Sequence, residues 1–307
     1  MTTAFISHAD CNLHNMGSEH PESPLRLQAI RKVLERTGLM QELQQYTAIP
    51  ASAQQIALAH SHQHSARLEE QQPEKGIVYC DDDTALCPDS LRAASLAAGS
   101  AIQAADLVLG GSNKNAFCAI RPPGHHAEHS LAMGFCFYNN VAIGALHALQ
   151  QPSVQRVAIV DFDVHHGNGT VDIFRDRPEV LVCSTFQYPY YPERYQDIER
   201  DNILNCPLPA YSKPALFRHA LEDRWLPALQ AHKPDIIFIS AGFDAHLEDP
   251  MADLELTEED YRWATQLLSD VARQCCGGRI VSVLEGGYNP VALGFSVQAH
   301  LEVLAGY

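Results

Sequence analysis

The sequence predicts an α/β fold in three layers, with helices on both faces of a central, mainly parallel sheet. From about residue 90 onward, stretches with helical periodicity alternate with short apolar runs, and this alternation is typical of parallel strands joined by helices. Hydrophobic residues make up 46% of the chain and charged residues 19%, which is the composition of a globular protein with a large core. We find no internal repeat, low-complexity tract or linker, so we expect one domain over residues 1–307.

The expected elements begin with a helix near the N-terminus. Ser23 can cap this helix, which has Pro24 at its first position and apolar residues along one face. The next expected helix, residues 90–109, is rich in Ala and Leu and stops at Gly110 and Gly111.

The remaining expected elements alternate between strand and helix. The strands are apolar runs at residues 115–120, 157–160, 180–186, 236–240 and 279–284. The helices cover residues 139–149, 170–176, 214–231 and 258–275. Thr257 and Asp260 resemble an N-terminal capping pair for the last of these helices, and Gly277 and Gly278 end it.

The charge and cysteine content restrict the possible partners and compartment. The formal net charge of −16 argues against nucleic-acid binding. An acidic surface would attract cationic partners such as lysine-rich peptides or polyamines, although a surface that keeps the protein soluble is the simpler explanation. The nine cysteines are scattered without a CxxC pair, and the adjacent Cys275 and Cys276 are best explained by packing. Without a signal peptide or an apolar stretch of 18 residues, we expect a cytoplasmic protein that does not enter a membrane.

The segment VAIVDFDVHHGNGT, residues 157–170, predicts a metal site. Its apolar run ends in Asp161, Asp163 and His165 at every second position. Alternate residues of a strand share a face, so two carboxylates and an imidazole would project together from its carboxyl end. Ligands of parallel α/β sheets bind at that end of the strands.

Other expected strand ends also carry polar groups. One strand runs into RPPGHHAEH, in which His125 and His126 follow a rigid Pro-Pro-Gly turn; burying both rings needs a partner for each, so a functional pair is favoured. Asp244 follows another strand and can be a turn residue or a further metal ligand. The last strand runs into LEGGYNP, whose glycines allow close backbone approach while Tyr288 points into the site. Two carboxylates and one imidazole suit a catalytic zinc with an open position.

Six motifs, taken in order, resemble those of the histone deacetylase family of the arginase/deacetylase fold. They are HPESPLRL, RPPGHHAE, GFCFYNN, DFDVHHGNGT, AGFDAHLEDP and LEGGYN. The resemblance extends from about His8 to Leu304. It fits the bacterial and class II branch best, because position 168 is Asn where the class I pattern has Asp. The resemblance implies a zinc amidohydrolase that acts on acylated amines.

The resemblance also implies roles for the residues at the strand ends. Asp163, His165 and Asp244 would bind Zn²⁺, which polarises the amide carbonyl and acidifies bound water. His126 would be the general base toward that water and later the acid toward the leaving amine. Tyr288 would donate a hydrogen bond to the developing oxyanion.

Further residues are assigned by the same resemblance to supporting roles. His125 would be an electrostatic partner held by Asp161, and Asn168 would orient His126. The walls of a narrow acyl-lysine channel and its surroundings would include Gly134, Phe135, Tyr191, Met251 and Gly286. A structural K⁺ would be bound by Asp161, Asp163, His165, Ser184 and Thr185. A second monovalent site would lie near Phe174.

Several functions remain open from the sequence. A zinc-dependent deacylase of N-ε-acyl-lysine in proteins or peptides is the first hypothesis, and an acetylpolyamine amidohydrolase is its closest rival. A eukaryotic polyamine-selective branch of the family carries a glutamate after the Asp-Pro of the AGFDAHLEDP motif and an inserted Pro-x-Cys-Glu near the entrance. This chain has Met251 in EDPM and HPESP without the insertion, so the resemblance favours acyl-lysine. A binuclear manganese ureohydrolase would need a DxD that SAGFDAHLED lacks, and a non-catalytic binder of acylated ligands would need a loss of chemistry that no motif indicates. The sequence alone does not predict the oligomeric state.

Overall fold

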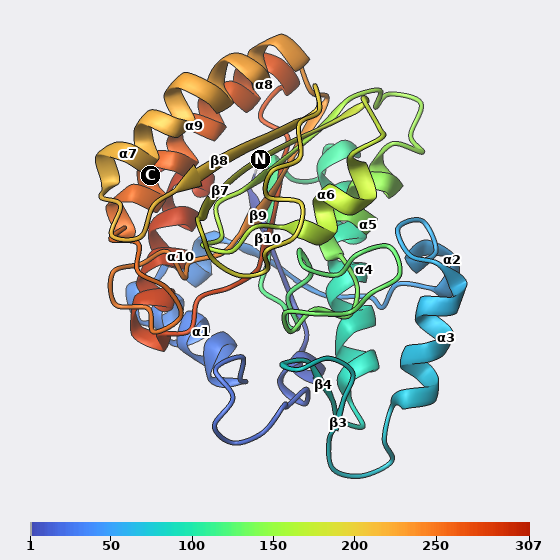
Figure 1. The fold of residues 1–307 in the computed structure, drawn as a ribbon. Coiled ribbons are helices and arrows are strands. Elements are labelled where there is room, and N and C mark those ends of the chain that lie inside the picture. Colours follow the sequence, from blue (N-terminus) through green and yellow to red (C-terminus); the bar gives the residue numbers. More distant parts are fainter. Residues whose placement is uncertain (1) are drawn as a thin grey trace.

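A parallel sheet forms the centre of the computed structural model, which describes residues 2–307 (Figure 1). Within these residues the sheet has eight strands in the order β2-β1-β5-β10-β9-β6-β7-β8, and every neighbouring pair is parallel. The strands are β1 Thr3–Ser7, β2 Gln44–Thr47, β5 Asn115–Cys118, β6 Val157–Asp161, β7 Val180–Gln187, β8 Ile203–Leu208, β9 Ile236–Ala241 and β10 Ile280–Leu284. A small antiparallel hairpin pairs β3 Val78–Tyr79 with β4 Ala85–Leu86.

Helices cover both faces of the sheet, as expected for three layers. One face carries α4 and α5, and the other carries α1, α9 and α10, which pack on one another (Figure 1). The longer helices are α1 Leu25–Thr37, α3 His62–Gln71, α4 Ser90–Leu109, α5 Asn140–Ala148, α9 Glu258–Cys276 and α10 Pro290–Ala305. The shorter ones are α2 Ala53–Ile56, α6 Asn168–Phe174, α7 Pro214–Ala220 and α8 Leu226–His232. None of the helices within residues 2–307 is long and apolar enough to span a membrane.

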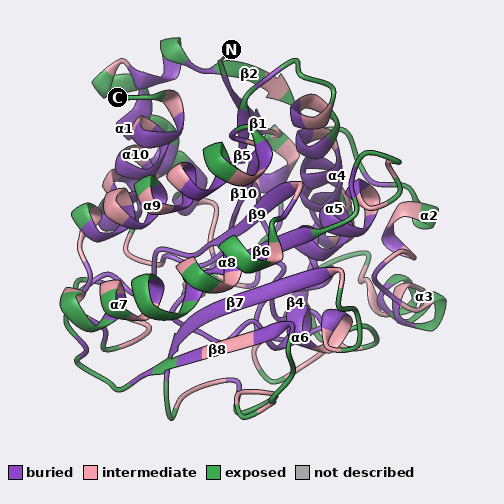
Figure 2. Ribbon diagram, turned by 90° about the horizontal axis from the view of Figure 1, so that it is seen from above, coloured by how far each residue is buried: buried purple, intermediate pink, exposed green. Residues whose placement is uncertain are grey.

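Burial explains why five of the strands were recognisable and why the two edge strands were not. The five strands expected from apolar runs are buried along their whole length (Figure 2). The sequence analysis missed β2 and β8, which lie at the two edges of the sheet and contain half-exposed or exposed residues. It also missed β1 and α10.

Two local predictions were wrong. The expected helix 214–231 is interrupted, because Leu221–Trp225 forms a π-helical segment between α7 and α8. Pro24, not Ser23, is the residue at the N-cap of α1, and no side chain caps this helix. The capping pair of α9 is present, since Asp260 accepts from the backbone N–H of Thr257 at 2.9 Å and Gly277 closes the helix in the left-handed region.

The strand order brings the polar strand ends together. β6 lies between β9 and β7, and β10 lies next to β9. Because all these strands are parallel, the segments that follow their carboxyl ends meet at one edge of the sheet.

Candidate metal centre and active site

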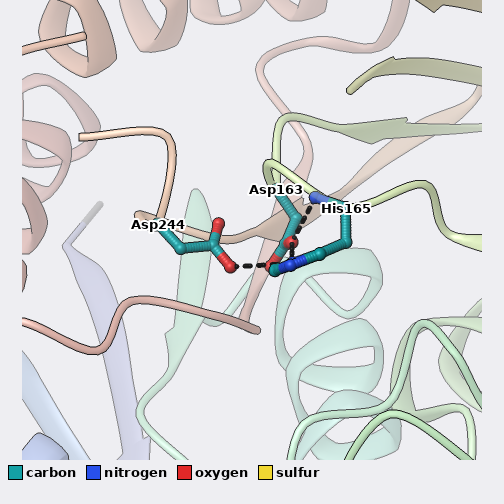
Figure 3. A group of neighbouring side chains, drawn as sticks. All are labelled: Asp163, His165 and Asp244. Carbon is teal, nitrogen blue, oxygen red and sulfur yellow. Dashed lines mark hydrogen bonds and ion pairs between the residues drawn. The ribbon is translucent and has the colours of Figure 1, made fainter. Parts of the chain in front are cut away.

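Asp163, His165 and Asp244 form a buried cluster at this edge (Figure 3). Nδ1 of His165 lies 3.1 Å from Oδ1 of Asp163 and 3.2 Å from Oδ2 of Asp244. One potential ligand atom from each residue lies within 4.8 Å of the other two. Asp163 and His165 come from the segment after β6, and Asp244 comes from the segment after β9.

The structure corrects the simple strand prediction for this segment. β6 ends at Asp161, so Asp163 and His165 lie beyond the strand and strict alternation does not hold there. Asp161 stands outside the three-residue cluster. Its Oδ2 accepts from Nδ1 of His125 at 2.9 Å, and its Oδ1 accepts from the backbone N–H of Asp163 at 3.1 Å.

Backbone groups hold the two carboxylates of the cluster. The N–H of Gly286 donates to Oδ2 of Asp163 at 2.8 Å, and the N–H of Val164 donates to Oδ1 of Asp244 at 2.9 Å. A Cβ added to Gly286 would lie closer than 3.0 Å to both carboxylates, so this segment can approach the cluster only without a side chain.

The electrostatics of the cluster suit a cation. Burial opposes a charge on His165, but its contacts with Asp163 and Asp244 raise its pKa to about 10. Two carboxylates and an imidazole are also the donor types of three-ligand catalytic zinc sites. The residues present therefore fit Zn²⁺.

His125 and His126 lie side by side but have different partners. Their ring centroids are 4.0 Å apart, and Nδ1 of His126 lies 2.8 Å from Oδ1 of Asn168. Burial opposes a charge on His125, but Asp163 and Asp161 raise its pKa well above the usual value. Burial, and then the neighbouring His125 and His165, lower the pKa of His126 well below it. The surroundings therefore favour the protonated form of His125 and the neutral form of His126.

A narrow cavity of about 160 Å³ leads to these groups. Its lining includes four of the predicted channel residues, Gly134, Phe135, Tyr191 and Met251, together with Tyr288. Gly286 is not among the lining residues. Its backbone instead lies against the carboxylates of Asp163 and Asp244. The sequence analysis missed two further lining residues, Asp83 and Tyr190.

Aromatic contacts shape the cavity. The rings of Phe135 and Tyr288 meet edge to face at 5.9 Å, and the ring of Tyr190 stacks on His165 at 5.6 Å. Burial raises the pKa of Tyr288 well above 10 although Arg26 opposes this shift, so its hydroxyl keeps its proton and can donate.

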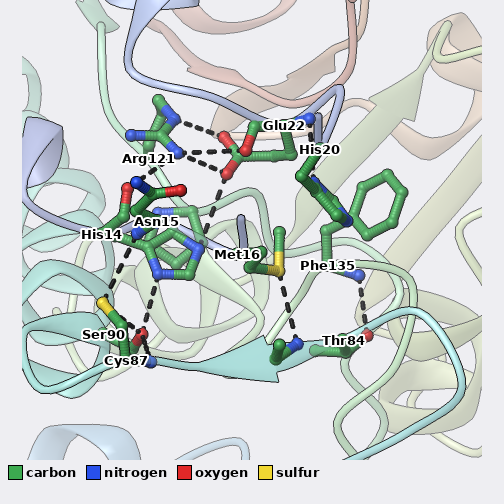
Figure 4. A network of polar contacts seen from close by, with 12 residues as sticks. His14, Asn15, Met16, His20, Glu22, Thr84, Cys87, Ser90, Arg121 and Phe135 are labelled. Atoms are coloured by element: carbon green, nitrogen blue, oxygen red, sulfur yellow. Dashed lines mark hydrogen bonds and ion pairs between the residues drawn. The ribbon is translucent and has the colours of Figure 1, made fainter. Parts of the chain in front are cut away.

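A buried polar network supports the Phe135 wall (Figure 4). The backbone N–H of Phe135 donates to Oγ1 of Thr84 at 2.9 Å, and the ring of His20 meets Phe135 edge to face at 4.6 Å. His20 precedes Glu22, whose carboxylate binds Arg121 through two hydrogen bonds of 2.5 and 2.6 Å. The wall is thereby tied to the sheet.

The sequence analysis assigned no role to three acidic residues near the site. Glu285, next to Gly286, accepts from the backbone N–H groups of Gly124 at 2.7 Å and His125 at 3.1 Å. Asp249 accepts from the backbone N–H of Tyr288 at 2.7 Å. Glu128 hydrogen-bonds Asn168. All three lie within the recognised motifs, but no local pattern indicates which backbone or side chain they contact.

Two of the predicted potassium ligands, Asp163 and His165, belong to the metal cluster, and the others lie on β6 and β7. Asp161 pairs in register with Ser184 of β7, and Thr185 follows on the same strand. Oγ of Ser184 is buried and has no hydrogen-bond partner among the described residues. Phe174, the residue named for a second site, is buried at the end of α6.

Comparison with known proteins identifies the family. Residues 20–304 match the histone deacetylase domain. The histone deacetylase-like amidohydrolase of Pseudomonas aeruginosa is 37% identical over 294 residues, covering 94% of this chain and 77% of that protein. The polyamine deacetylase HDAC10 of Mus musculus is 35% identical over 337 residues, covering 100% of this chain and 48% of that protein. The crystal structure of the HDA15 HD domain, 34% identical, superposes with a TM-score of 0.93 and covers 99% of this chain and 88% of that one. With its mainly parallel sheet of the arginase/deacetylase fold, the chain belongs to the histone deacetylase family.

Proposed function

We propose that this protein is a zinc-dependent deacylase that removes acetyl or other acyl groups from N-ε-acyl-lysine of proteins or peptides. The observation that carries the proposal is the cluster of Asp163, His165 and Asp244 beside the adjacent rings of His125 and His126, at a narrow cavity with aromatic walls. Membership of a family of deacetylases and amidohydrolases supports hydrolysis of an amide.

Asp163, His165 and Asp244 would hold the metal. When bound, Zn²⁺ supplies Lewis acidity to a carbonyl oxygen and to water. The open side of the three-residue set, toward the cavity, leaves room for substrate.

The protein groups would handle the protons and the developing charge. Neutral His126 takes the proton from the attacking water and later gives it to the leaving amine. His125, charged and paired with Asp161, contributes a fixed positive charge next to it. Tyr288 keeps its phenolic proton and donates a hydrogen bond to the oxyanion.

The cavity suits a thin, mostly aliphatic substituent. Phe135 and the two tyrosines, Tyr190 and Tyr191, can enclose the methylene stem of a lysine and exclude bulk water. Asp83 lies at the same cavity and can accept a hydrogen bond from an amide or an ammonium group of the substrate.

An acetylpolyamine is the second candidate substrate. The mouse relative is named a polyamine deacetylase, and Asp81 and Asp82 next to Asp83 add negative charge that would attract a cationic amine. Against this substrate, Met251 gives the cavity an apolar group where a carboxylate would hold a second ammonium. We therefore place acyl-lysine first.

A comparison of hydrolysis rates on different acylated amines tests the proposed substrate class. A zinc-verified preparation of the full chain is assayed on acetyl-lysine peptides, on longer acyl-lysine peptides and on acetylpolyamines. We expect the highest kcat/KM on an acyl-lysine peptide, with activity lost on chelation and restored by Zn²⁺. A preference of tenfold or more for acetylpolyamines would contradict the proposed acyl-lysine substrate. Full activity in metal-free protein would contradict the proposed zinc-dependent mechanism.

We further propose a structural K⁺ at Asp161, Asp163, His165, Ser184 and Thr185. The buried Ser184 hydroxyl without a partner supports this site, because such a group is costly unless something satisfies it. Replacing K⁺ by tetramethylammonium at equal ionic strength should lower the melting temperature, and an unchanged value would contradict the site.

The nine cysteines, all free in the structure, support a reducing compartment such as the cytoplasm, which stays a prediction.

A further inference from the structure

The side-chain amide of Asn168 lies between the ring of His126 and three hydrogen-bond acceptors. Its Oδ1 lies 2.8 Å from Nδ1 of His126. Its Nδ2 donates to Oε1 of Glu128 at 2.8 Å, and at 3.3 Å to the backbone oxygen of His126 and to Sδ of Met133. An amide has an acceptor on one side and donors on the other, so the groups around Asn168 decide which side meets His126.

Glu128 is the strongest of these acceptors, because it is the nearest of the three and carries a charge. It is 5% exposed, and Nε and an Nη of Arg194 donate to its two oxygens at 2.6 and 2.9 Å. A carboxylate held in this way can only accept a hydrogen bond from Asn168. It therefore selects the orientation in which Nδ2 faces Glu128 and Oδ1 faces His126.

The orientation of Asn168 in turn fixes the proton on His126. Oδ1 of an amide can only accept, so Nδ1 of the neutral imidazole must carry the ring proton. Nε2 is then the nitrogen with the free lone pair. A carboxylate at position 168 would accept on both sides and would need no partner to orient it.

We propose that Glu128, held by Arg194, is a positioning residue that fixes the Nδ1–H tautomer of His126 through the amide of Asn168. The proposal rests on the proposed function in one respect, since it makes Nε2 of His126 the atom that takes the proton from water. The tautomer itself can be observed without turnover.

Two substitutions at Glu128 separate orientation from mere packing. Glu128→Ala removes the charged and nearest acceptor and leaves only two longer contacts of Nδ2, at 3.3 Å, so Asn168 can rotate and the two tautomers of His126 can mix. Glu128→Gln keeps an oxygen that can accept from Asn168 and should preserve the tautomer. In the ¹⁵N spectrum of the labelled, zinc-loaded full chain, we expect the Nδ1–H pattern for His126 in wild type and Glu128→Gln, and a shift toward Nε2–H in Glu128→Ala.

The same variants should differ in kcat rather than in KM. A wrong tautomer disables the base, so kcat of Glu128→Ala on an acetyl-lysine peptide should fall by at least about tenfold while KM changes less than about twofold. Glu302→Ala is the matched control, because Glu302 also binds an arginine, Arg262, and a side-chain amide, that of Gln298, but lies on α10. This control should keep the wild-type tautomer and kcat.

An exchange of the two side chains gives a rescue test. Asn168→Asp alone places a carboxylate about 2.8 Å from that of Glu128 and should lower kcat by repulsion. Adding Glu128→Gln lets the new amide donate to the carboxylate introduced at position 168, and should restore kcat at least about fivefold over Asn168→Asp.

The outcomes are distinguishable from those of the proposed function. An Nδ1–H pattern with full kcat in Glu128→Ala would overturn the positioning role. If Glu128→Ala does not fold, a double variant no better than Asn168→Asp overturns it instead. A tautomer shift in Glu128→Ala without amide hydrolysis by the wild type would retain the positioning role and reject the function.

Discussion

His125 and His126 are adjacent in the chain, yet their surroundings give them opposite charge states. His125 faces Asp161 and Asp163, whereas His126 faces a neutral amide and two other imidazoles. Two titratable neighbours whose pKa values are driven apart can divide acid and base roles. These differences support the proposal that His126 carries out the proton transfers and that His125 keeps a positive charge.

Tyr288 should contribute mainly to the transition state. Replacing it by Phe removes one oxyanion donor, so kcat should fall by about 10²–10³-fold, or roughly 2.7–4 kcal/mol. The ring contacts with Phe135 and Arg26 remain, so zinc content and the Kd of a zinc-binding inhibitor should change little. Steady-state kinetics and calorimetry measure these quantities.

Tyr211→Phe provides the control for this variant, because Tyr211 is 68% exposed and does not line the cavity. Its kcat should equal that of the wild type. Unchanged turnover in Tyr288→Phe would contradict the donor role and would favour a protein that binds acylated ligands without hydrolysing them.

At the scale of elements, the sequence predicted where the ligands lie but not how they are held. Buried parallel strands can be predicted from apolar runs in the sequence, so the strand ends that precede Asp163 and Asp244 could be located. The contact of Arg194 with Glu128 joins residues 66 apart in the chain, and no local spacing indicates such a pair. The strands β2 and β8 lie at the edges of the sheet, where one side meets solvent. They therefore contain polar residues and lack an apolar run.

The segment after β10 should be intolerant of any side chain at Gly286. Gly286→Ala places a methyl group closer than 3.0 Å to the carboxylates of Asp163 and Asp244, so one or both must move. We expect zinc affinity to fall by at least about tenfold, as when groups that support ligands are disturbed. Competition with a fluorescent chelator measures this affinity.

Gly306→Ala tests whether backbone strain alone could cause such a loss. Gly306 has a φ of 95° at the end of α10, and an added Cβ would meet nothing within 4 Å. It should lower stability by roughly 1 kcal/mol and leave zinc affinity unchanged. Wild-type zinc affinity in Gly286→Ala would show that the cluster can shift without loss of binding and would contradict the proposed role of this segment.

At the scale of the whole molecule, a sheet covered on both faces also buries histidines that do not belong to the metal cluster. His14, His60 and His300 are each at most 2% exposed. Burial lowers the pKa of His300 from 6.5 to about 3, and burial is also the main cause that lowers the pKa values of His14 and His60 to about 4 and about 3. The fold therefore requires these rings to be neutral.

This requirement makes stability depend on pH with a definite sign. As pH falls below about 6.5, the unfolded chain binds a proton at each such histidine while the folded chain does not. Stability is therefore complete above about pH 6.5 and declines as pH falls toward the folded-state pKa. For one histidine, the loss between about pH 7 and pH 5 amounts to about 2 kcal/mol.

His300→Gln isolates one of these contributions. In the wild type, Nδ1 of His300 lies 2.6 Å from Oγ1 of Thr265 and Nε2 lies 2.9 Å from Oγ of Ser282, and an amide can bind both hydroxyls without titrating. The variant will be less stable at pH 7, but its free energy of unfolding in urea should fall by about 2 kcal/mol less between pH 7 and pH 5 than that of the wild type. His219→Gln, at a side chain 67% exposed, should keep the wild-type difference. Equal differences in His300→Gln and the wild type would mean that the ring is protonated in the folded protein, and the neutral buried histidine would have to be abandoned.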